Sequence, residues 1–552
     1  MLPVLVAAAV VASLGAGAAV PAGTAGAGAE APAGSDEARI VSIYPNPSAH
    51  GDEGEFVRLW LPADADLAEY SLADDQVTVP LSTGENQAPP RPPPGGGYVT
   101  VSTDPNLTAS ITDRRVTLLD DRFQLANGGD EVQLFHNGTV IDDLRYDRAP
   151  EGDVYNATAD RWRPLGATER PVVTAGSGEV EVFVLPDEPD RAIEALRSAD
   201  DRILLAGYTL TSQRVVDALL SAHRRGVTVE VLVEGAPVGG MSERAAAALD
   251  ELTAAGVPVR VVGGERARYR FHHAKYAVVD DSALVTTENW KPSGVGGRSS
   301  RGWAVLTDQS RIVEGLLATY RADAGWEDAI PWAEFDGTTL VDAEPADGEY
   351  PSQFDPRSVP VERTRLLVAP DNAREGLVSL IAGAEESVAV KQVRIGSRGF
   401  PLLQAIIDAA QRGVEVHILL SGAWYVRDEN ERMAAWLAEQ AETGDLPLSV
   451  RLAEPDGRFE KIHAKGLIVD GETVALGSAN WNDNSLRNNR EVVLVLDGEA
   501  AAGYFGEVFD ADWTTRRDQS GRDHQLPLGL ALACLAVAVL AILVAARLRF
   551  ER

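Results

Sequence analysis

Two short clusters of histidine, lysine and aspartate contain the residues best suited to chemistry. Each cluster has a histidine, a lysine two residues later and an aspartate five residues after the lysine. The members are His273, Lys275 and Asp280 in the first cluster, and His463, Lys465 and Asp470 in the second. On a β-strand, side chains two residues apart point to the same face, so each cluster would place an imidazole beside an ammonium group. A neutral imidazole can attack phosphorus, and a second one can protonate the leaving oxygen. The pair of clusters therefore predicts phosphodiester cleavage at one shared site, with no metal required.

Polar residues follow both clusters and extend this prediction. Asn289 follows the first cluster, and Ser478, Asn480 and Glu491 follow the second. Lysine and asparagine side chains can donate hydrogen bonds to the non-bridging phosphate oxygens, whose charge must be stabilised in the transition state. The chain has only eight histidines and five lysines, so a matched pair of clusters is not expected by chance.

Alternating strand and helix patterns surround both clusters. The same order of elements occurs over residues 177–327 and again over 364–515, with an offset of about 190 residues. Alternation of this kind predicts an α/β fold with a largely parallel sheet. Duplication predicts two α-β-α halves related by a pseudo-twofold axis. An acidic, proline-punctuated stretch at 328–363 is expected to link the halves.

The second cluster, with Gly477, Ser478, Asn480 and Glu491, resembles the signature of the phospholipase D superfamily, and the first resembles it with departures. This resemblance covers residues 177–515. It implies a two-step phosphodiesterase or phosphatidyl transferase that works through a phosphohistidine, without a cofactor. One chain would suffice to form the active site.

The departures lie in the first half. Gly302 stands where the second half has Glu491, so the acidic residue that orients a histidine in the family is missing there. Glu288 is a candidate substitute. In the family the histidine of the first motif is the nucleophile, so the resemblance implies that His273 is the nucleophile and His463 the general acid. The presence of Glu491 in the second half would instead favour His463 as the nucleophile. The sequence leaves the two roles open.

The region before the duplication is rich in short strand patterns. Residues 35–147 resemble a lamin-tail domain in the stretches 43–47, 51–57 and 127–132. The resemblance implies an immunoglobulin-like β-sandwich that binds an unknown ligand or acts as a spacer. A linker is expected over 148–176.

Both ends of the chain are apolar. Residues 1–34 predict a signal peptide followed by small residues, with an uncleaved anchor as the alternative. Residues 526–546 predict a transmembrane helix, and the arginine-rich tail 547–552 predicts that its end is cytoplasmic. The catalytic domains would then lie on the extracellular side of the cell membrane, held by a single span. The one cysteine, Cys534, lies in this apolar run, so no intramolecular disulfide can form.

The charge of the chain is strongly acidic. Asp and Glu number 83 against 50 Lys and Arg, which gives a formal net charge of -33. Because concentrated salt screens repulsion between carboxylates, such a surface favours a halophilic protein, with ordinary acidity as the alternative. The acidity also argues against long nucleic acids as partners.

Three functions fit these observations. The first is a membrane-anchored enzyme of lipid metabolism that hydrolyses phospholipids or transfers their phosphatidyl groups. The second is an extracellular nuclease of the same superfamily. The third is a surface protein that binds a ligand without catalysis.

Overall fold

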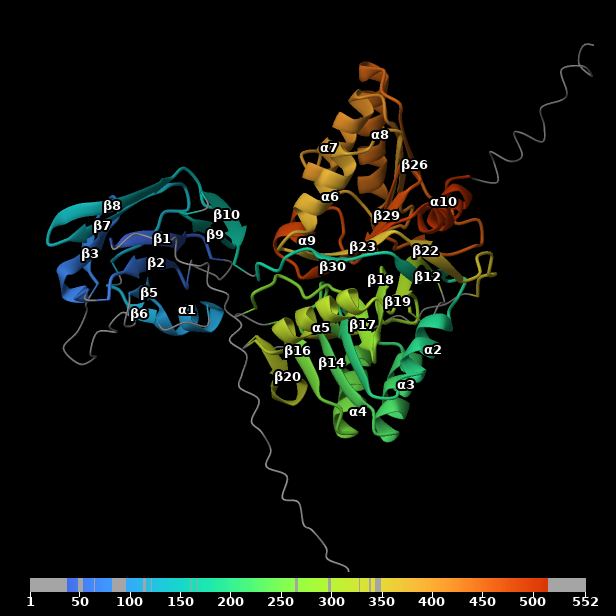
Figure 1. The fold of residues 1–552 in the computed structure, drawn as a ribbon, viewed down its shortest axis with the longest axis horizontal. Coiled ribbons are helices and arrows are strands. Elements are labelled where there is room, and N and C mark those ends of the chain that lie inside the picture. Colours follow the sequence, from blue (N-terminus) through green and yellow to red (C-terminus); the bar gives the residue numbers. More distant parts are fainter. Residues whose placement is uncertain are drawn as a thin grey trace, which may run out of the picture. The chain divides into compact units, whose positions relative to one another are not determined.

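The computed structural model describes residues 37–514, except for 48–52, 64, 82–95, 113–115, 121, 159, 166, 264–266, 296–298, 327, 337–338 and 343–348. Within these ranges the chain forms a β-rich region followed by two α/β halves, each with its own sheet (Figure 1).

The β-rich region contains two sheets. One has the order β10-β9-β1-β2-β5-β6 and the other the order β4-β3-β7-β8. The strands of the first sheet are β1 (Arg39–Tyr44), β2 (Phe56–Leu61), β5 (Gly97–Ser102), β6 (Val116–Leu118), β9 (Asp153–Asn156) and β10 (Arg161–Pro164). Those of the second are β3 (Tyr70–Ala73), β4 (Thr78–Pro80), β7 (Asp130–His136) and β8 (Thr139–Tyr146). A short 3-10 turn, η2 (Leu67–Glu69), and the helix α1 (Pro105–Thr112) complete the region. Buried side chains from both sheets form one core, as in a β-sandwich.

The first α/β half is built on a mixed sheet with the order β20-β16-β14-β13-β17-β18-β19-β12-β22. The strands are β12 (Gly178–Leu185), β13 (Arg202–Gly207), β14 (Thr228–Glu234), β16 (Val259–Val262), β17 (Tyr276–Val279), β18 (Ser282–Thr286), β19 (Ser300–Thr307), β20 (Ala329–Pro331) and β22 (Arg357–Val361). Its helices are α2 (Arg191–Arg197), α3 (Gln213–Arg224), α4 (Glu243–Ala254) and α5 (Ser310–Ala324). A 3-10 turn, η3 (Trp332–Glu334), and a small pair of strands, β15 (Met241–Ser242) and β21 (Leu340–Val341), lie beside the sheet.

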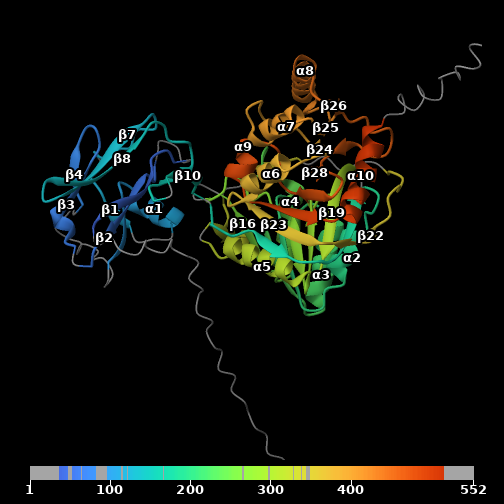
Figure 2. The same cartoon turned by 45° about the horizontal axis from the view of Figure 1, so that its top comes forward.

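The second half repeats this plan with the sheet order β11-β23-β30-β29-β28-β24-β25-β26. The strands are β11 (Val173–Ala175), β23 (Arg363–Ala369), β24 (Ser387–Gln392), β25 (Glu415–Leu420), β26 (Leu448–Leu452), β28 (Gly466–Val469), β29 (Thr473–Gly477) and β30 (Glu491–Asp497). The helices are α6 (Ala373–Ala382), α7 (Pro401–Gln411), α8 (Arg427–Gly444), α9 (Asp483–Arg487) and α10 (Glu499–Trp513). Figure 2 shows α6, α7 and α8 gathered on one side of this sheet.

The two halves share a hydrophobic core. It contains strands from both sheets together with the apolar faces of α5 and α10. Separate clusters bury α2, α3 and α4 against the first sheet, and α6, α7 and α8 against the second. Because the shared core has no boundary between the halves, they form one packed body rather than two tethered domains.

Buried ion pairs also connect the halves, in a pattern that repeats with the duplication. Arg301 of the first half lies 3.0 Å from Asp512 of the second, and Arg490 of the second half lies 3.0 Å from Asp323 of the first. All four side chains are fully buried. Each arginine directly precedes the position at which the sequence pattern expects an orienting carboxylate.

Three parts of the predicted organisation need correction. The sheets are mixed rather than largely parallel: β13-β14-β16 and β24-β25-β26 run parallel, whereas the strands from β17 to β19 and from β28 to β30 pair antiparallel. A short turn joins β17 to the antiparallel β18, and residues 287–299 join β18 to the antiparallel β19. Residues 148–176 contribute β9, β10 and β11 rather than only a linker, and 328–363 contribute β20 to β22.

The transmembrane part of the predicted fold is wrong for the chain as described. Within the described ranges no helix is long and apolar enough to cross a membrane. The longest of these helices, α8, contains Arg427, Asp428 and Glu429 in its first turn and packs against a sheet. The predicted segment 526–546 lies outside the described residues, as do the predicted signal sequence 1–34 and the tail 547–552.

Candidate active site

The two histidine clusters lie where the halves meet. His273 and Lys275 directly precede β17, and His463 and Lys465 lie between β27 (Lys461–Ile462) and β28. Both clusters therefore occupy the same position in their half. Their placement depends on main-chain hydrogen bonds that cross from one half to the other.

These main-chain bonds form a reciprocal pattern. The amide of His273 donates to the carbonyl oxygen of Arg490 at 3.0 Å, and the amide of His463 donates to that of Arg301 at 3.0 Å. β27 continues the second contact by pairing with β19. His273 is consequently held beside Arg490, which directly precedes Glu491. His463 is held beside Arg301, which directly precedes Gly302.

A carboxylate from the opposite half contacts each histidine ring. Both carboxylate oxygens of Glu491 lie 2.9 Å from Nδ1 of His273. One carboxylate oxygen of Glu288 lies 3.2 Å from Nδ1 of His463. Glu491 was expected to support the histidine of its own half, and this expectation is wrong because β30 brings its side chain to the histidine of the other half. Glu288, the candidate substitute, does reach a histidine.

Glu491 is held by further donors. The hydroxyl of Ser485 donates to it at 2.8 Å and the amide of Asn489 at 3.1 Å. Burial alone would raise the pKa of Glu491, but His273, Lys275 and a hydrogen bond from Ser478 lower it below the usual value. Glu491 is therefore ionised and accepts only, so Nδ1 of His273 carries the proton and Nε2 has the free lone pair.

The two lysines lie beside their histidines. Nζ of Lys275 donates to the carbonyl oxygen of His273 at 2.6 Å. Nζ of Lys465 donates to the carbonyl oxygen of His463 at 2.7 Å and lies 3.1 Å from Nδ1 and 3.3 Å from Nε2 of that ring. Both lysines are buried, with 0% and 3% of their surface exposed. Burial lowers the pKa of both lysines, that of Lys275 well below its usual value. A phosphate that enters the site favours their charged forms and interacts strongly with them in these desolvated surroundings.

The ionisation of these groups is coupled across the halves. Burial lowers the pKa of His273 to about 4, with Glu491 opposing this shift and Lys275 adding to it. Burial and Lys465 lower the pKa of His463 to about 4, and Glu288 opposes the shift. The lysine of the opposite half lowers each of these values further. Both imidazoles are thus neutral at pH 7 in the free protein, which suits attack on phosphorus.

Asp280 and Asp470 lie away from this site, although the sequence pattern placed them with the catalytic residues. Asp280 follows β17 and accepts hydrogen bonds from the amides of residues 200, 201 and 202 at 2.8–2.9 Å. Asp470 follows β28 and accepts from the amides of residues 385, 386 and 387. They sit at the far end of the strand from the lysine and fix the turn that precedes β13 or β24. An aspartate therefore recurs at this position in both halves because it fixes the same turn in each of them.

The remaining predicted site residues differ in their surroundings. Ser478 is fully buried, and its hydroxyl accepts from the amide of Val492 at 3.0 Å, so it supports the strand that carries Glu491. Asn289 and Asn480 are half-buried. The side-chain oxygen of Asn289 is buried without a hydrogen-bond partner.

Aromatic residues near the clusters fall into two groups. Trp290 and Trp481 are buried core residues. Tyr208 instead packs edge-on against His273 with 4.7 Å between ring centroids, and Tyr425 lies 5.7 Å from Nζ of Lys461. Trp424 is 86% exposed. Tyr208 is therefore the aromatic residue that limits the space beside His273.

Comparisons with known proteins identify the family of the duplicated domain. A family model described as "Cardiolipin synthase, PLD-like domain" matches residues 192–323 and 377–513, one segment in each half. The duplicated domain belongs to the phospholipase D superfamily. Both matched segments of this phospholipase D domain contain one histidine-lysine cluster and its partner positions.

Curated relatives match the phospholipase D domain in part. Cardiolipin synthase A of Citrobacter koseri is 34% identical over 115 residues, which is 21% of this chain and 22% of that protein. Cardiolipin synthase A of Yersinia pseudotuberculosis is 32% identical over 109 residues, 20% of this chain and 21% of that protein. The matches thus span about a fifth of the relatives' length.

Solved structures are also similar. Phosphatidylserine synthase of Haemophilus influenzae has a TM-score of 0.45 at 16% identity and covers 64% of this chain and 86% of its own. NucT of Helicobacter pylori has a TM-score of 0.24 at 26% identity, covering 27% of this chain and 94% of its own.

Proposed function

We propose that this chain is a phosphodiesterase that acts on phospholipids, by hydrolysis or by transfer of a phosphatidyl group, through a covalent phosphohistidine. The observation that carries the proposal is the reciprocal pairing of Glu491 with His273 and of Glu288 with His463. Each half supplies one histidine and the carboxylate that faces the other histidine. Neither half alone holds a complete set.

The first step forms the covalent intermediate. Nε2 of His273 attacks phosphorus while the bond from phosphorus to the leaving oxygen breaks. The negative charge of the bound diester raises the pKa of His463, so this ring takes up a proton when the substrate enters. His463 then gives its Nε2 proton to that oxygen, and the leaving group departs as a neutral alcohol. Lys275 and Lys465 stabilise the charge on the non-bridging oxygens. Glu491 stabilises the positive charge that develops on the ring of His273.

The second step reverses these roles. His463, now neutral, takes a proton from a water molecule or an alcohol as its oxygen attacks phosphorus. The bond between Nε2 and phosphorus breaks, which frees His273. Water gives hydrolysis and an alcohol gives transfer. The relatives named cardiolipin synthase support a phospholipid substrate.

The net charge of -33 also supports a lipid rather than a long polyanion such as DNA. The test is to assay the full-length chain on a vesicle phospholipid, on bis(p-nitrophenyl) phosphate and on single-stranded DNA, in high salt. We expect turnover of the phospholipid and the small diester. Preference for DNA would replace the proposal with a nuclease, and no turnover of any diester by folded protein would refute catalysis.

A further inference from the structure

The carboxylate positions of the two halves differ by an exchange between two neighbouring strands. In the second half, Glu491 begins β30 and pairs with Ala369. The register-equivalent residue of the first half is Gly302, which pairs with Leu185. The first half has its carboxylate at position 288, just after β18, where the second half has Ala479. Glutamate and a small residue have thus changed places.

Gly302 makes this exchange sterically possible. A Cβ atom built on Gly302 would lie 2.2 Å from Cγ of Glu288 and 2.6 Å from its Oε1. Both distances are far below van der Waals contact. A second glycine has the same effect on another side, because a Cβ atom on Gly294 would lie 2.7 Å from Oε2 of Glu288. The side chain of Glu288 therefore fills space that any larger residue at 302 or 294 would occupy.

Glu288 lies beside the ring of His463, the histidine of the opposite half. His463 is fixed by main-chain bonds to Arg301, the residue before Gly302. A carboxylate at position 302 would consequently face the ring of His463, as Glu491 faces that of His273. Glu288 reaches the same ring, with Oε2 3.2 Å from Nδ1.

The support around the two carboxylates is unequal. Glu491 accepts hydrogen bonds from Ser485 and Asn489 besides His273. Oε1 of Glu288 is buried and has no hydrogen-bond partner. Since an unsatisfied buried carboxylate oxygen is costly, packing alone does not account for a glutamate at position 288.

We infer that Glu288 is the positioning residue of His463, and that Glu288 with Gly302 replaces a carboxylate at position 302 as a coupled pair. The inference rests on the proposed function, in which His463 transfers the proton. Glu288 acts through His463: it fixes the ring with Nδ1 protonated and stabilises the imidazolium. It does not need to touch the substrate.

A double variant of the full-length chain tests the coupling. Glu288→Ala alone should lower kcat about 100-fold with KM nearly unchanged, since positioned acid–base groups contribute about 10²–10⁴-fold. Gly302→Glu alone should also lose activity, because the new side chain collides with Glu288. The combination Glu288→Ala/Gly302→Glu should recover to within about tenfold of the unaltered chain. Glu472→Ala, which removes an exposed carboxylate, serves as the control and should change neither parameter.

The outcomes separate the inference from the proposed function. A folded double variant no more active than Glu288→Ala would overturn the inference while the unaltered chain still turns over diesters. If the unaltered chain is inactive, NMR of the histidine ring resonances decides, with His463→Ala used for assignment. Glu288→Gln should lower the pKa of His463 and the double variant should restore it. An unchanged value in Glu288→Gln would also overturn the inference.

Discussion

Glu491 lies in the second half of the duplicated domain, yet its carboxylate is 2.9 Å from Nδ1 of His273 in the first half. The contact arises because the amide of His273 is bonded to the carbonyl oxygen of Arg490. Two segments more than 200 residues apart in the chain are thereby joined at one atom of the candidate nucleophile. The separation of the two bonded residues is 218 positions.

Glu491→Gln should abolish most of the turnover while leaving the fold intact. The amide still fills the space, but it cannot stabilise the imidazolium and it permits the wrong tautomer of His273. In serine hydrolases the comparable loss is about 10⁴-fold, so we expect a fall in kcat of at least about 100-fold. Steady-state kinetics on a small diester measure the effect, with Glu472→Gln as the exposed control. Activity within threefold of the unaltered chain would contradict the role of Glu491.

The pH dependence should show a loss of activity on the alkaline side. Burial lowers the pKa of Lys465 to about 8, although Glu288 and Glu491 oppose this shift. As pH rises through about 8, Lys465 loses its proton and with it the charge that stabilises the non-bridging oxygens. The value of kcat/KM, which reports the free enzyme, should therefore fall above about pH 8. A flat profile up to pH 10 would exclude a charge requirement at Lys465.

Asp280→Ala should reduce stability rather than catalysis. The change removes the acceptor of amides at 200, 201 and 202, and it places alanine at a positive φ of 50°. We expect a loss of about 1–2 kcal/mol in the free energy of unfolding. Denaturant unfolding measures this loss, and kcat well below the melting temperature should stay unchanged. A large fall in kcat without a change in stability would instead indicate that Asp280 has a role in catalysis.

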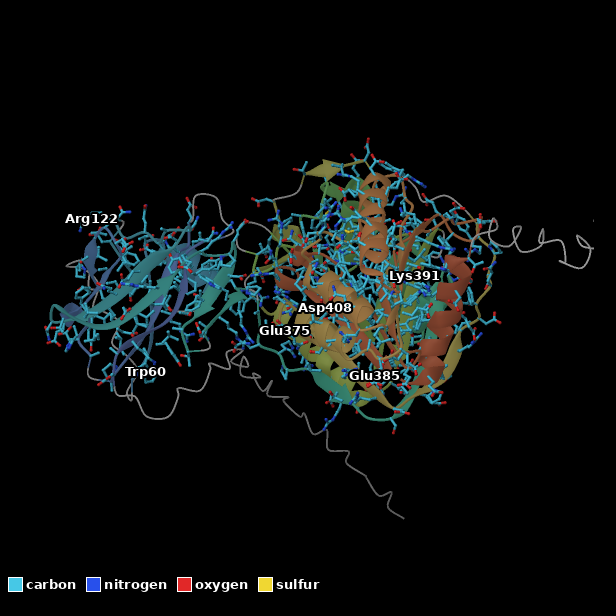
Figure 3. All side chains as sticks on the ribbon, turned by 90° about the horizontal axis from the view of Figure 1, so that it is seen from above. Trp60, Arg122, Glu375, Glu385, Lys391 and Asp408 are labelled. Atoms are coloured by element: carbon cyan, nitrogen blue, oxygen red, sulfur yellow. The ribbon has the colours of Figure 1, made fainter. Side chains whose placement is uncertain are left out.

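Asp512→Ala should destabilise the chain strongly. Asp512 is buried on α10 and contacts Arg301, Lys391 and Arg458 at 3.0, 2.8 and 2.6 Å. Figure 3 labels Lys391, whose ammonium group also donates to a carbonyl oxygen of α10. Arg301 would keep its ion pair with Asp187, but Lys391 and Arg458 would each lose the acid that they contact. Leaving buried cations without a partner costs about 3–5 kcal/mol. Thermal unfolding tests this prediction, with Asp510→Ala on the same helix as the control.

Most of the architecture was accessible from the sequence. Strand and helix patterns repeat at a constant offset, and the histidine-lysine spacing survives in both halves, so the duplication and the paired clusters follow from local signals. The antiparallel part of each sheet did not follow, because the sequence pattern alone does not determine the direction in which β17, β18 and β19 pair.

The local sequence also does not predict which histidine each carboxylate contacts. Sequence spacing suggests that Glu491 supports His463, whereas the contact depends on main-chain bonds between the halves. One signal for Glu288 was present when the sequences of the two halves are aligned. Glu288 is aligned with Ala479, and Gly302 is aligned with Glu491. Asp280 and Asp470 show the opposite case, since a repeated polar residue close to catalytic residues had a structural role.

The N-terminal region keeps two untested predictions. The structure shows two sheets with a common core, and the lamin-tail resemblance and its ligand stay predictions. The halophilic interpretation of the acidic composition and the extracellular location are likewise predictions. Measuring stability and turnover across a range of salt concentrations would test the halophilic interpretation.

The most direct test of the shared active site is turnover of a small phosphodiester in EDTA by the full-length chain and by its His273→Ala and His463→Ala variants. We predict that the unaltered chain is active and that each variant, although folded, loses at least about 1000-fold in kcat. Turnover near the unaltered level in either variant would contradict the claim that the two halves form one active site.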